Sequence, residues 1–404
     1  MSQPRPRPQT LRLTPIPGQL VVAEFFFEVP LDYTDPHGPT LQLFARAATK
    51  HAPPLDPADV PPPPQDPKAV FSRPWLLYLE GGPGFGNKEP QDNALTRLVL
   101  ARGYQVLYLD YRGTGLSTPV HAHGVVRLGP PPVQAEYLRR FRADNIVRDC
   151  EAVRMCLTAH HHPDHPPAAA SHPHRPRWSL FGQSYGGFVA LTYLSHFPDS
   201  LREVFLTGGL APVGVPPAAV YQATYARVER RNREYFAAFP EDRATLQHVA
   251  MFLAGEPDGA LALPGGGKLT FPRVLTLGNA LGMHGGPDMV HAVVLRMKSD
   301  LMQAGIFTRA TLKTLEDFLP LDTCPIHAIL HEAIYCGGKG VASRWAAFEV
   351  GAQLTPFRWL RETFRSQDVL GDDLYFSGGV CSFTHPLFQD PSPPGTQQNA
   401  VKTE

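Results

Sequence analysis

Short, continuous apolar runs recur along the first half of the chain and predict buried strands. Each run is compatible with a strand and leads into glycine-containing sequence. Strands of a parallel sheet are covered on both faces, and they therefore show such runs instead of an alternating pattern. The runs are Trp75–Leu79, Tyr104–Leu109, Trp178–Phe181 and Glu203–Thr207.

Segments with helical spacing lie between these runs. Within residues 142–160, Ile146, Cys150 and Val153 fall on one face of a predicted helix. Residues Phe188–Leu194 show a second run of apolar positions at helical spacing. This alternation of strands and helices predicts an α/β fold with a mostly parallel sheet flanked by helices.

The pattern differs before and after this region. Residues Phe25–Leu31 and Leu41–Arg46 predict a hairpin or meander, whereas the sequence beyond residue 211 is mainly helical, as in an inserted lid or cap. We therefore predict an α/β core at residues 1–211, a mainly helical cap at residues 212–376 and a divergent, disordered tail at residues 377–404.

Composition and charge narrow the function classes. The chain has 404 residues and a net formal charge of zero, so bulk electrostatics favour neither nucleic acid nor an anionic membrane as a partner. It contains no apolar run long enough to span a bilayer, and its proline-rich start lacks the apolar stretch of a signal peptide. The five cysteines are sparse and odd in number, which suggests a reducing compartment. We expect a soluble cytoplasmic protein, with an oligomeric state that the sequence does not indicate.

Two segments invite a cofactor interpretation. The histidines of residues 160–176 could hold a metal, but prolines separate them irregularly, and a solvated loop is the favoured alternative. The sequence Gly265-Gly266-Gly267-Lys268 suggests a phosphate loop, yet Leu269 stands where a P-loop needs Ser or Thr, and we predict a glycine turn. We expect neither a metal nor another cofactor.

Candidate chemistry centres on Ser184. Gly182-Gln183-Ser184-Tyr185-Gly186 has the G-x-S-x-G form of a nucleophile elbow, between a predicted strand and a predicted helix. In such elbows one oxyanion donor is the backbone N–H of the residue after the nucleophile, here Tyr185. The second comes from a loop after an earlier strand, and the glycine-rich segment Glu80–Gly86 fits that role through Gly81 or Gly82.

Several segments together resemble the proline iminopeptidases, a family of α/β-hydrolase peptidases. The resemblance extends from about Phe25 to about Phe376 and covers the loop, the elbow and a segment typical of the family's cap. The matching segments are Glu80-Gly81-Gly82-Pro83-Gly84, Asp110–Ser117, Phe141–Asp149, Gly182–Gly187 and Leu330–Cys336.

The resemblance implies an α/β-hydrolase fold with a large helical cap and release of an N-terminal proline from peptides or amides. Ser184 would attack the prolyl carbonyl to form an acyl-enzyme that water then cleaves. Family members grip the free amine of the substrate with cap glutamates, and Glu332 is the best match to one of them. The alternative for Glu332 is a surface salt bridge.

The chain also departs from the family. Glu80 replaces the histidine of the family's HGGPG loop. Elbow enzymes place the catalytic Asp and His after the nucleophile, and family members carry both beyond the cap. The residues after Phe376 show neither of the two strands that would carry this Asp and this His. His385 is a poor candidate for the base. We expect an incomplete triad, missing C-terminal sheet strands and impaired activity, as in a truncated or frameshifted product.

Two other functions stay open. The same fold could serve an esterase or a broader aminopeptidase. A Glu332 that binds an ammonium group would argue against an esterase, since an ester substrate need not carry that charge. A non-catalytic protein that binds peptide ends through the same cleft is the third interpretation.

Overall fold

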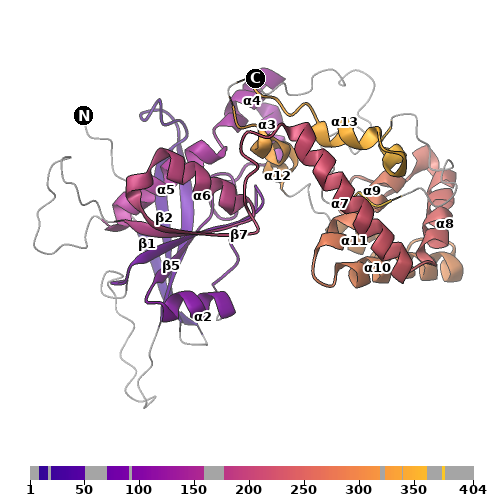
Figure 1. Ribbon diagram of the computed structural model, residues 1–404, viewed down its shortest axis with the longest axis horizontal. Coiled ribbons are helices and arrows are strands. Elements are labelled where there is room, and N and C mark those ends of the chain that lie inside the picture. Colours follow the sequence, from indigo (N-terminus) through magenta and orange to yellow (C-terminus); the bar gives the residue numbers. More distant parts are fainter. Residues whose placement is uncertain are drawn as a thin grey trace, which may run out of the picture. The chain divides into compact units, whose positions relative to one another are not determined.

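The computed structural model describes residues 9–16, 20–50, 71–90, 93–158, 177–318, 324–338, 340–361 and 375–377. The chain forms two compact units (Figure 1). The first comprises Met1–Ala211 and Pro325–Leu330, and the second comprises Pro212–Cys324 and His331–Glu404. No helix among the described residues is both long and apolar enough to cross a membrane.

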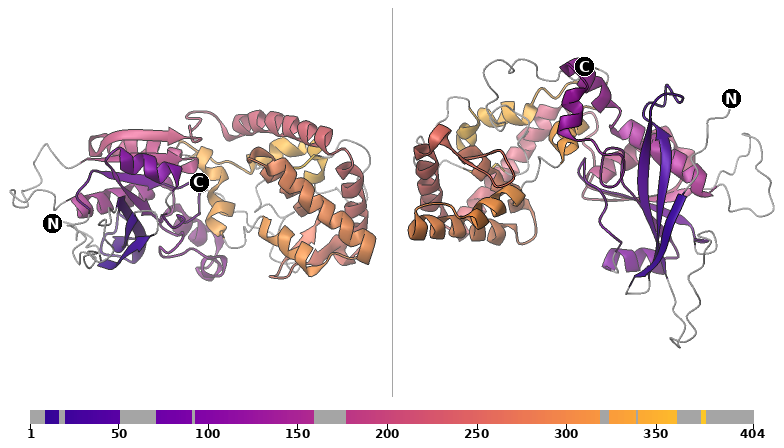
Figure 2. Two further views of the ribbon diagram at one scale, coloured as in Figure 1. Left: turned by 90° about the horizontal axis from the view of Figure 1, so that it is seen from below. Right: turned by 180° about the vertical axis from the view of Figure 1, so that it is seen from behind.

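A seven-stranded sheet organises the described part of the first unit, in the order β1-β2-β3-β5-β4-β6-β7. Strands β5, β4, β6 and β7 run parallel to one another, whereas β1, β2 and β3 join the sheet by antiparallel pairing, with β3 antiparallel to β5. The long β2 and β3 are the indigo strands in the right-hand view of Figure 2. The strands are β1 (Gln9–Ile16), β2 (Leu20–Pro30), β3 (Thr40–Lys50), β4 (Trp75–Leu79), β5 (Gln105–Leu109), β6 (Trp178–Gln183) and β7 (Leu201–Thr207).

Helices cover both faces of this sheet (Figure 1). Helix α2 packs its Val99 and Leu100 against Leu76 and Val106 on one face. Helices α5 and α6 pack against each other, and α6 lies along β6, β4 and β7. The helices of this unit are α2 (Ala94–Ala101), α3 (Ala122–Arg127), α4 (Pro131–Arg139), α5 (Ala143–Thr158), α6 (Tyr185–His196) and α12 (Pro325–Leu330).

The second unit is mainly helical and has its own apolar core. Its longest helices, α7 and α10, are visible in both views of Figure 2. The core gathers large side chains such as Tyr225, Phe271 and Trp359, all of which are buried. The elements are α7 (Pro217–Ala238), α8 (Asp242–Gly255), β8 (Ala260–Ala262), β9 (Lys268–Thr270), α9 (Phe271–Leu275), α10 (Gly286–Ala304), α11 (Arg309–Phe318) and α13 (Ala346–Ala352).

The structure confirms the strands and helices that the apolar pattern predicts. The N-terminal hairpin is the β2–β3 pair, and the glycine turn at residues 265–267 joins the antiparallel strands β8 and β9. Segment 325–330, which the sequence places inside the cap, instead clusters with the first unit. The predictions for residues 160–176, for His385 and for the tail lie outside the described residues.

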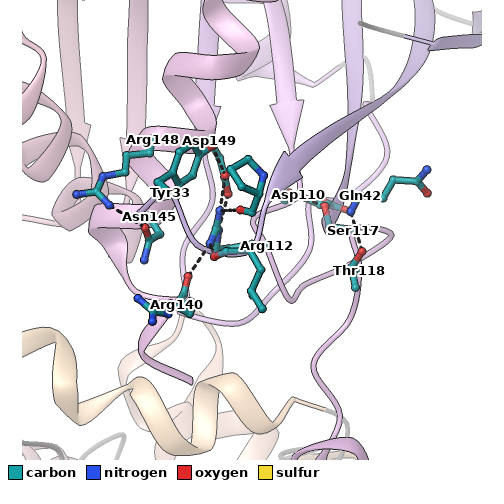
Figure 3. Close-up of polar contacts among 12 residues, drawn as sticks. Tyr33, Gln42, Asp110, Arg112, Ser117, Thr118, Arg140, Asn145, Arg148 and Asp149 are labelled. Atoms are coloured by element: carbon teal, nitrogen blue, oxygen red, sulfur yellow. Dashed lines mark hydrogen bonds and ion pairs between the residues drawn. The ribbon is translucent and has the colours of Figure 1, made fainter. Parts of the chain in front are cut away.

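A buried ion pair ties the loops of the first unit together (Figure 3). Arg112 and Asp149 have side chains that are 0% and 2% exposed, and their bond from Nη2 to Oδ1 is 2.6 Å long. Arg112 also donates to the Leu31 and Arg140 carbonyl oxygens, at 2.9 and 2.8 Å. The Tyr33 hydroxyl donates to Asp149 at 2.8 Å. Every charge in the cluster is thus paired, as a buried charge requires.

We expect Arg112→Met to lower the free energy of unfolding by about 3–5 kcal/mol, because it leaves the Asp149 carboxylate buried without its partner. The control is Arg139→Met. Arg139 pairs with Glu136 at the surface, where its side chain is 56% exposed, so this loss should stay below about 1 kcal/mol. Chemical denaturation followed by circular dichroism measures both. Equal losses in the two variants would contradict the role given to the buried pair.

Candidate active site

Ser184 occupies a sharp turn between β6 and α6. Its backbone has φ 53° and ψ −118°, a left-handed conformation that a residue with a side chain rarely adopts. Such a conformation costs on the order of 1–3 kcal/mol and persists only where the surroundings enforce it. Here the Ser184 N–H donates to the Thr207 carbonyl at 3.0 Å, and the Ser184 carbonyl accepts from the Gly187 N–H at 2.9 Å. The strand–elbow–helix arrangement predicted from the motif is therefore present.

Two glycines allow the backbones around the elbow to approach closely. A Cβ on Gly186 would lie 2.0 Å from the Leu79 carbonyl oxygen, and one on Gly187 would lie 2.0 Å from the Gly209 carbonyl oxygen. Both distances are far below van der Waals contact, so no side chain fits at either position. These two glycines of the motif thus allow the start of helix α6 to pack directly against the backbone at the end of β4 and just after β7, at Leu79 and Gly209.

The loop Glu80–Gly86 lies beside Ser184. It follows β4, which pairs in parallel with β6 through Leu79 and Gly182. A Cβ added to Gly81 would point at Ser184. It would lie 3.3 Å from the Cβ and 3.8 Å from the Oγ of Ser184. Tyr185 is buried and opens helix α6, where backbone N–H groups lack helical partners and favour negative charge. The structure therefore brings together Ser184, Tyr185, Gly81 and the loop that carries Gly82.

Glu80 engages one of the two candidate loop donors. Its carboxylate Oε1 accepts from the Gly81 N–H at 2.8 Å. Its backbone carbonyl accepts from the Tyr111 hydroxyl at 3.1 Å, and that ring is buried edge-on to Tyr185. The Gly81 N–H therefore already has a partner within the loop.

Asp110 holds the far end of the same loop. Its carboxylate accepts from the Asn87 and Leu116 N–H groups, at 2.7 and 2.8 Å. Asp110 is buried, and this burial raises the pKa of its carboxyl group. The segment Asp110–Ser117 therefore acts as a brace for the loop next to Ser184.

His327 contacts the loop from α12. Its Nδ1–H donates to the Pro83 carbonyl at 2.9 Å, and its ring centroid lies 4.9 Å from that of Phe85. Burial lowers the pKa of His327, although the hydrogen bond to Pro83 acts in the opposite direction. The sequence gives His327 no role, and no local signal indicates that it lies against a loop so distant along the chain.

Glu332 lies in the second unit and is not at the surface. It is 5% exposed, which contradicts the surface salt bridge considered as the alternative. Its Oε1 accepts from the Ala346 N–H at 2.8 Å and its Oε2 from the Ala347 N–H at 3.0 Å. Both residues open helix α13, so Glu332 satisfies N–H groups that a helix start leaves without partners.

One cluster in the second unit has the side chains of a metal site. Ligand atoms of Glu241, Asp242 and His291 all lie within 4.8 Å of one another. The same atoms already bond within the chain, since Asp242 accepts from the Tyr235 hydroxyl and lies 2.9 Å from His291 Nδ1. The His291 ring also stacks on Phe239. A hydrogen-bonded network thus accounts for two of these three side chains.

Comparison with known proteins gives consistent matches. A family model described as the alpha/beta hydrolase fold matches residues 74–263, which confirms the predicted fold class. A proline iminopeptidase of Aeromonas sobria is 39% identical over 354 residues, covering 87% of this chain and 72% of that protein. Proline iminopeptidase aneH of Aspergillus aculeatus is 39% identical over 331 residues, covering 82% and 67%. A crystal structure of proline iminopeptidase from Mycobacterium smegmatis is 14% identical, with a TM-score of 0.31, and covers 80% and 76%.

We expect His327 to make stability depend on pH. Its pKa is lowered in the folded chain, so its contribution is complete above the unfolded value of about 6.5 and is lost as the pH falls through the folded value. His327→Gln keeps an N–H donor but cannot titrate, and the decline in unfolding midpoint from pH 7 to pH 5 should be smaller in this variant. His37→Gln, at an exposed position, is the control. Parallel declines in all three proteins would refute this expectation.

Proposed function

This chain belongs to the proline iminopeptidase family of α/β-hydrolases, and we propose that it is a serine exopeptidase that releases N-terminal proline from peptides. The observation that carries the proposal is the strained Ser184 elbow directly beside the glycine loop. The loop lies beside Ser184 and α6 begins at Tyr185, so in this proposal backbone N–H groups of both segments stabilise the oxyanion that acyl transfer produces.

The proposed reaction proceeds through an acyl-enzyme. Ser184 Oγ attacks the prolyl carbonyl, and its proton passes to a base. The carbonyl oxygen gains negative charge, which the N–H groups of Gly82 and Tyr185 stabilise; the loss of one such donor typically costs about 10²–10³ in rate. The leaving amine takes up a proton and departs with the rest of the peptide. Water then attacks the prolyl ester, which frees proline and restores the Ser184 hydroxyl.

The proposed reaction requires a base that takes the proton of Ser184. Among the described residues, Ser184 Oγ makes no hydrogen bond to any side chain. A serine hydroxyl is a weak nucleophile without a base, and removal of the base eliminates most of the catalysis. We therefore propose that turnover by the 404-residue chain is impaired unless a residue outside the described part supplies this group.

Glu332 is the proposed partner of the substrate's charged imino group. Both of its oxygens already accept one backbone N–H each. A carboxylate offers about four lone-pair sites, so it can accept further hydrogen bonds from a cation. In this proposal Glu332 both opens helix α13 and selects substrates with a free amino terminus.

Hydrolysis of a chromogenic prolyl amide by the purified chain, beside Ser184→Ala, tests the reaction. We expect slow turnover in the parent protein that disappears in the variant, because the hydroxyl forms the acyl-enzyme. Turnover that persists in Ser184→Ala would refute the serine mechanism. A folded parent without turnover that still binds L-prolinamide would instead favour the non-catalytic binding protein.

Glu332→Gln tests the specificity. The amide removes the charge, so we expect at least a tenfold loss in kcat/KM for the prolyl amide and less than a threefold change for an ester without an amino group. Glu349→Gln, an exposed position on α13, serves as the control. Thermal unfolding of each variant shows whether lost stability at the start of α13, instead of the lost charge, explains a change in activity. Equal losses on both substrates would favour the esterase or broader aminopeptidase alternative.

A further inference from the structure

We propose that Glu80 provides a second anionic contact for the substrate's ammonium group, from the oxyanion loop itself. This inference rests on the proposed function and deepens it, since it assigns part of the amine specificity to the first unit. Glu80 follows strand β4 and is half-buried at the start of the loop beside Ser184.

The position of Glu80 suits a substrate cleaved after its first residue. In such a substrate the ammonium nitrogen is attached to the carbon next to the reacting carbonyl. Its counter-charge must therefore lie close to the nucleophile, whereas an endopeptidase needs no charge there. The carboxylate of Glu80 is bonded to the N–H of Gly81, and the Cβ direction of Gly81 ends 3.8 Å from Ser184 Oγ.

The distance from the nucleophile to the substrate's ammonium group can be compared with the position of Glu80. A reacting carbonyl lies about 3 Å from the nucleophile. The ammonium is two bonds further on, and a charge-assisted hydrogen bond adds about 2.8 Å. The Glu80 carboxylate lies one hydrogen bond from Gly81, and Gly81 is in contact with Ser184. These two short steps are compatible with a contact between Glu80 and the ammonium while the carbonyl faces Oγ.

The charge of Glu80 has no counter-ion in the described part of the chain. Oε1 bonds to the Gly81 N–H, and within these residues Glu80 forms no ion pair with a lysine, arginine or histidine. Its field reaches buried neighbours: burial, and after it the charge of Glu80, raise the pKa of Tyr78 to about 12. The Tyr78 hydroxyl donates its hydrogen bond to Gln183 Oε1, at 2.6 Å, and not to Glu80. A cationic ligand would supply the counter-ion that the described residues do not.

A purely local role is the competing explanation. Glu80 could simply fix the backbone at Gly81, with no contact to substrate. Glu80→Gln separates the two explanations, because the amide oxygen can still accept from the Gly81 N–H while the charge is gone. The two explanations then differ in what happens to a ligand with an ammonium group compared with one without it.

The experiment measures binding in a Ser184→Ala background, so that the result does not depend on turnover. Isothermal titration calorimetry gives the dissociation constants of L-prolinamide, which carries the ammonium, and of N-acetyl-L-prolinamide, which does not. We expect Glu80→Gln to weaken L-prolinamide on the order of tenfold and to leave the acetylated ligand within twofold. Glu28→Gln, an exposed carboxylate on β2, should match the parent for both ligands.

The other outcomes overturn the inference in distinguishable ways. If the parent binds L-prolinamide and Glu80→Gln binds it equally well, Glu80 does not contact the ammonium, and the proposed function stands. Equal weakening of both ligands would leave Glu80 only its role in fixing the loop. A parent that binds neither ligand would remove the proposed function together with this inference.

Discussion

The close approach of three backbone segments around Ser184 is the constraint on which the candidate site depends. The ends of β4, β6 and β7 meet at one edge of the sheet, where glycines leave no space for side chains. This packing holds Ser184 in a left-handed conformation that an isolated chain would abandon. The strain is therefore maintained by the sheet, and it places Ser184 beside the glycine loop, at the start of helix α6.

Support for this edge comes from groups that lie further from Ser184. Arg112 and Asp149 join the end of β2, the turn after α4 and helix α5 through a fully paired, buried cluster. The two residues before Arg112 hold the loop: the Tyr111 hydroxyl donates to the Glu80 carbonyl, and the Asp110 carboxylate accepts from the Asn87 N–H. His327 adds a contact to Pro83 from α12. The loop is thus fixed at several points along its length, which limits the reorganisation that a reaction would require.

The two glutamates considered for the substrate differ in their surroundings. Glu332 is buried, and both oxygens are occupied by N–H groups of α13. Glu80 is half-buried, and one oxygen is occupied by the N–H of Gly81. A carboxylate that holds a helix start contributes to stability as well as to charge, whereas Glu80 carries a charge that the described residues leave uncompensated. In the loop that resembles the family's HGGPG segment, a carboxylate therefore stands where the family has a histidine, and it accepts from the N–H of Gly81.

The sequence by itself determined the strands, the hairpin, the elbow at Ser184 and the family, because each is encoded within a short segment. Apolar runs specify buried strands wherever they occur, and the glycines beside Ser184 admit a turn that few other residues allow. Tertiary structure decided the remaining features. The bond from His327 to Pro83 joins residues 244 positions apart, and the burial of Glu332 depends on where α13 begins. The engagement of Gly81 by its neighbour Glu80 is local, yet it depends on a side-chain direction that the loop sets only once it is folded. Contacts of these kinds leave no periodic signal in a sequence, because they depend on how distant segments approach one another.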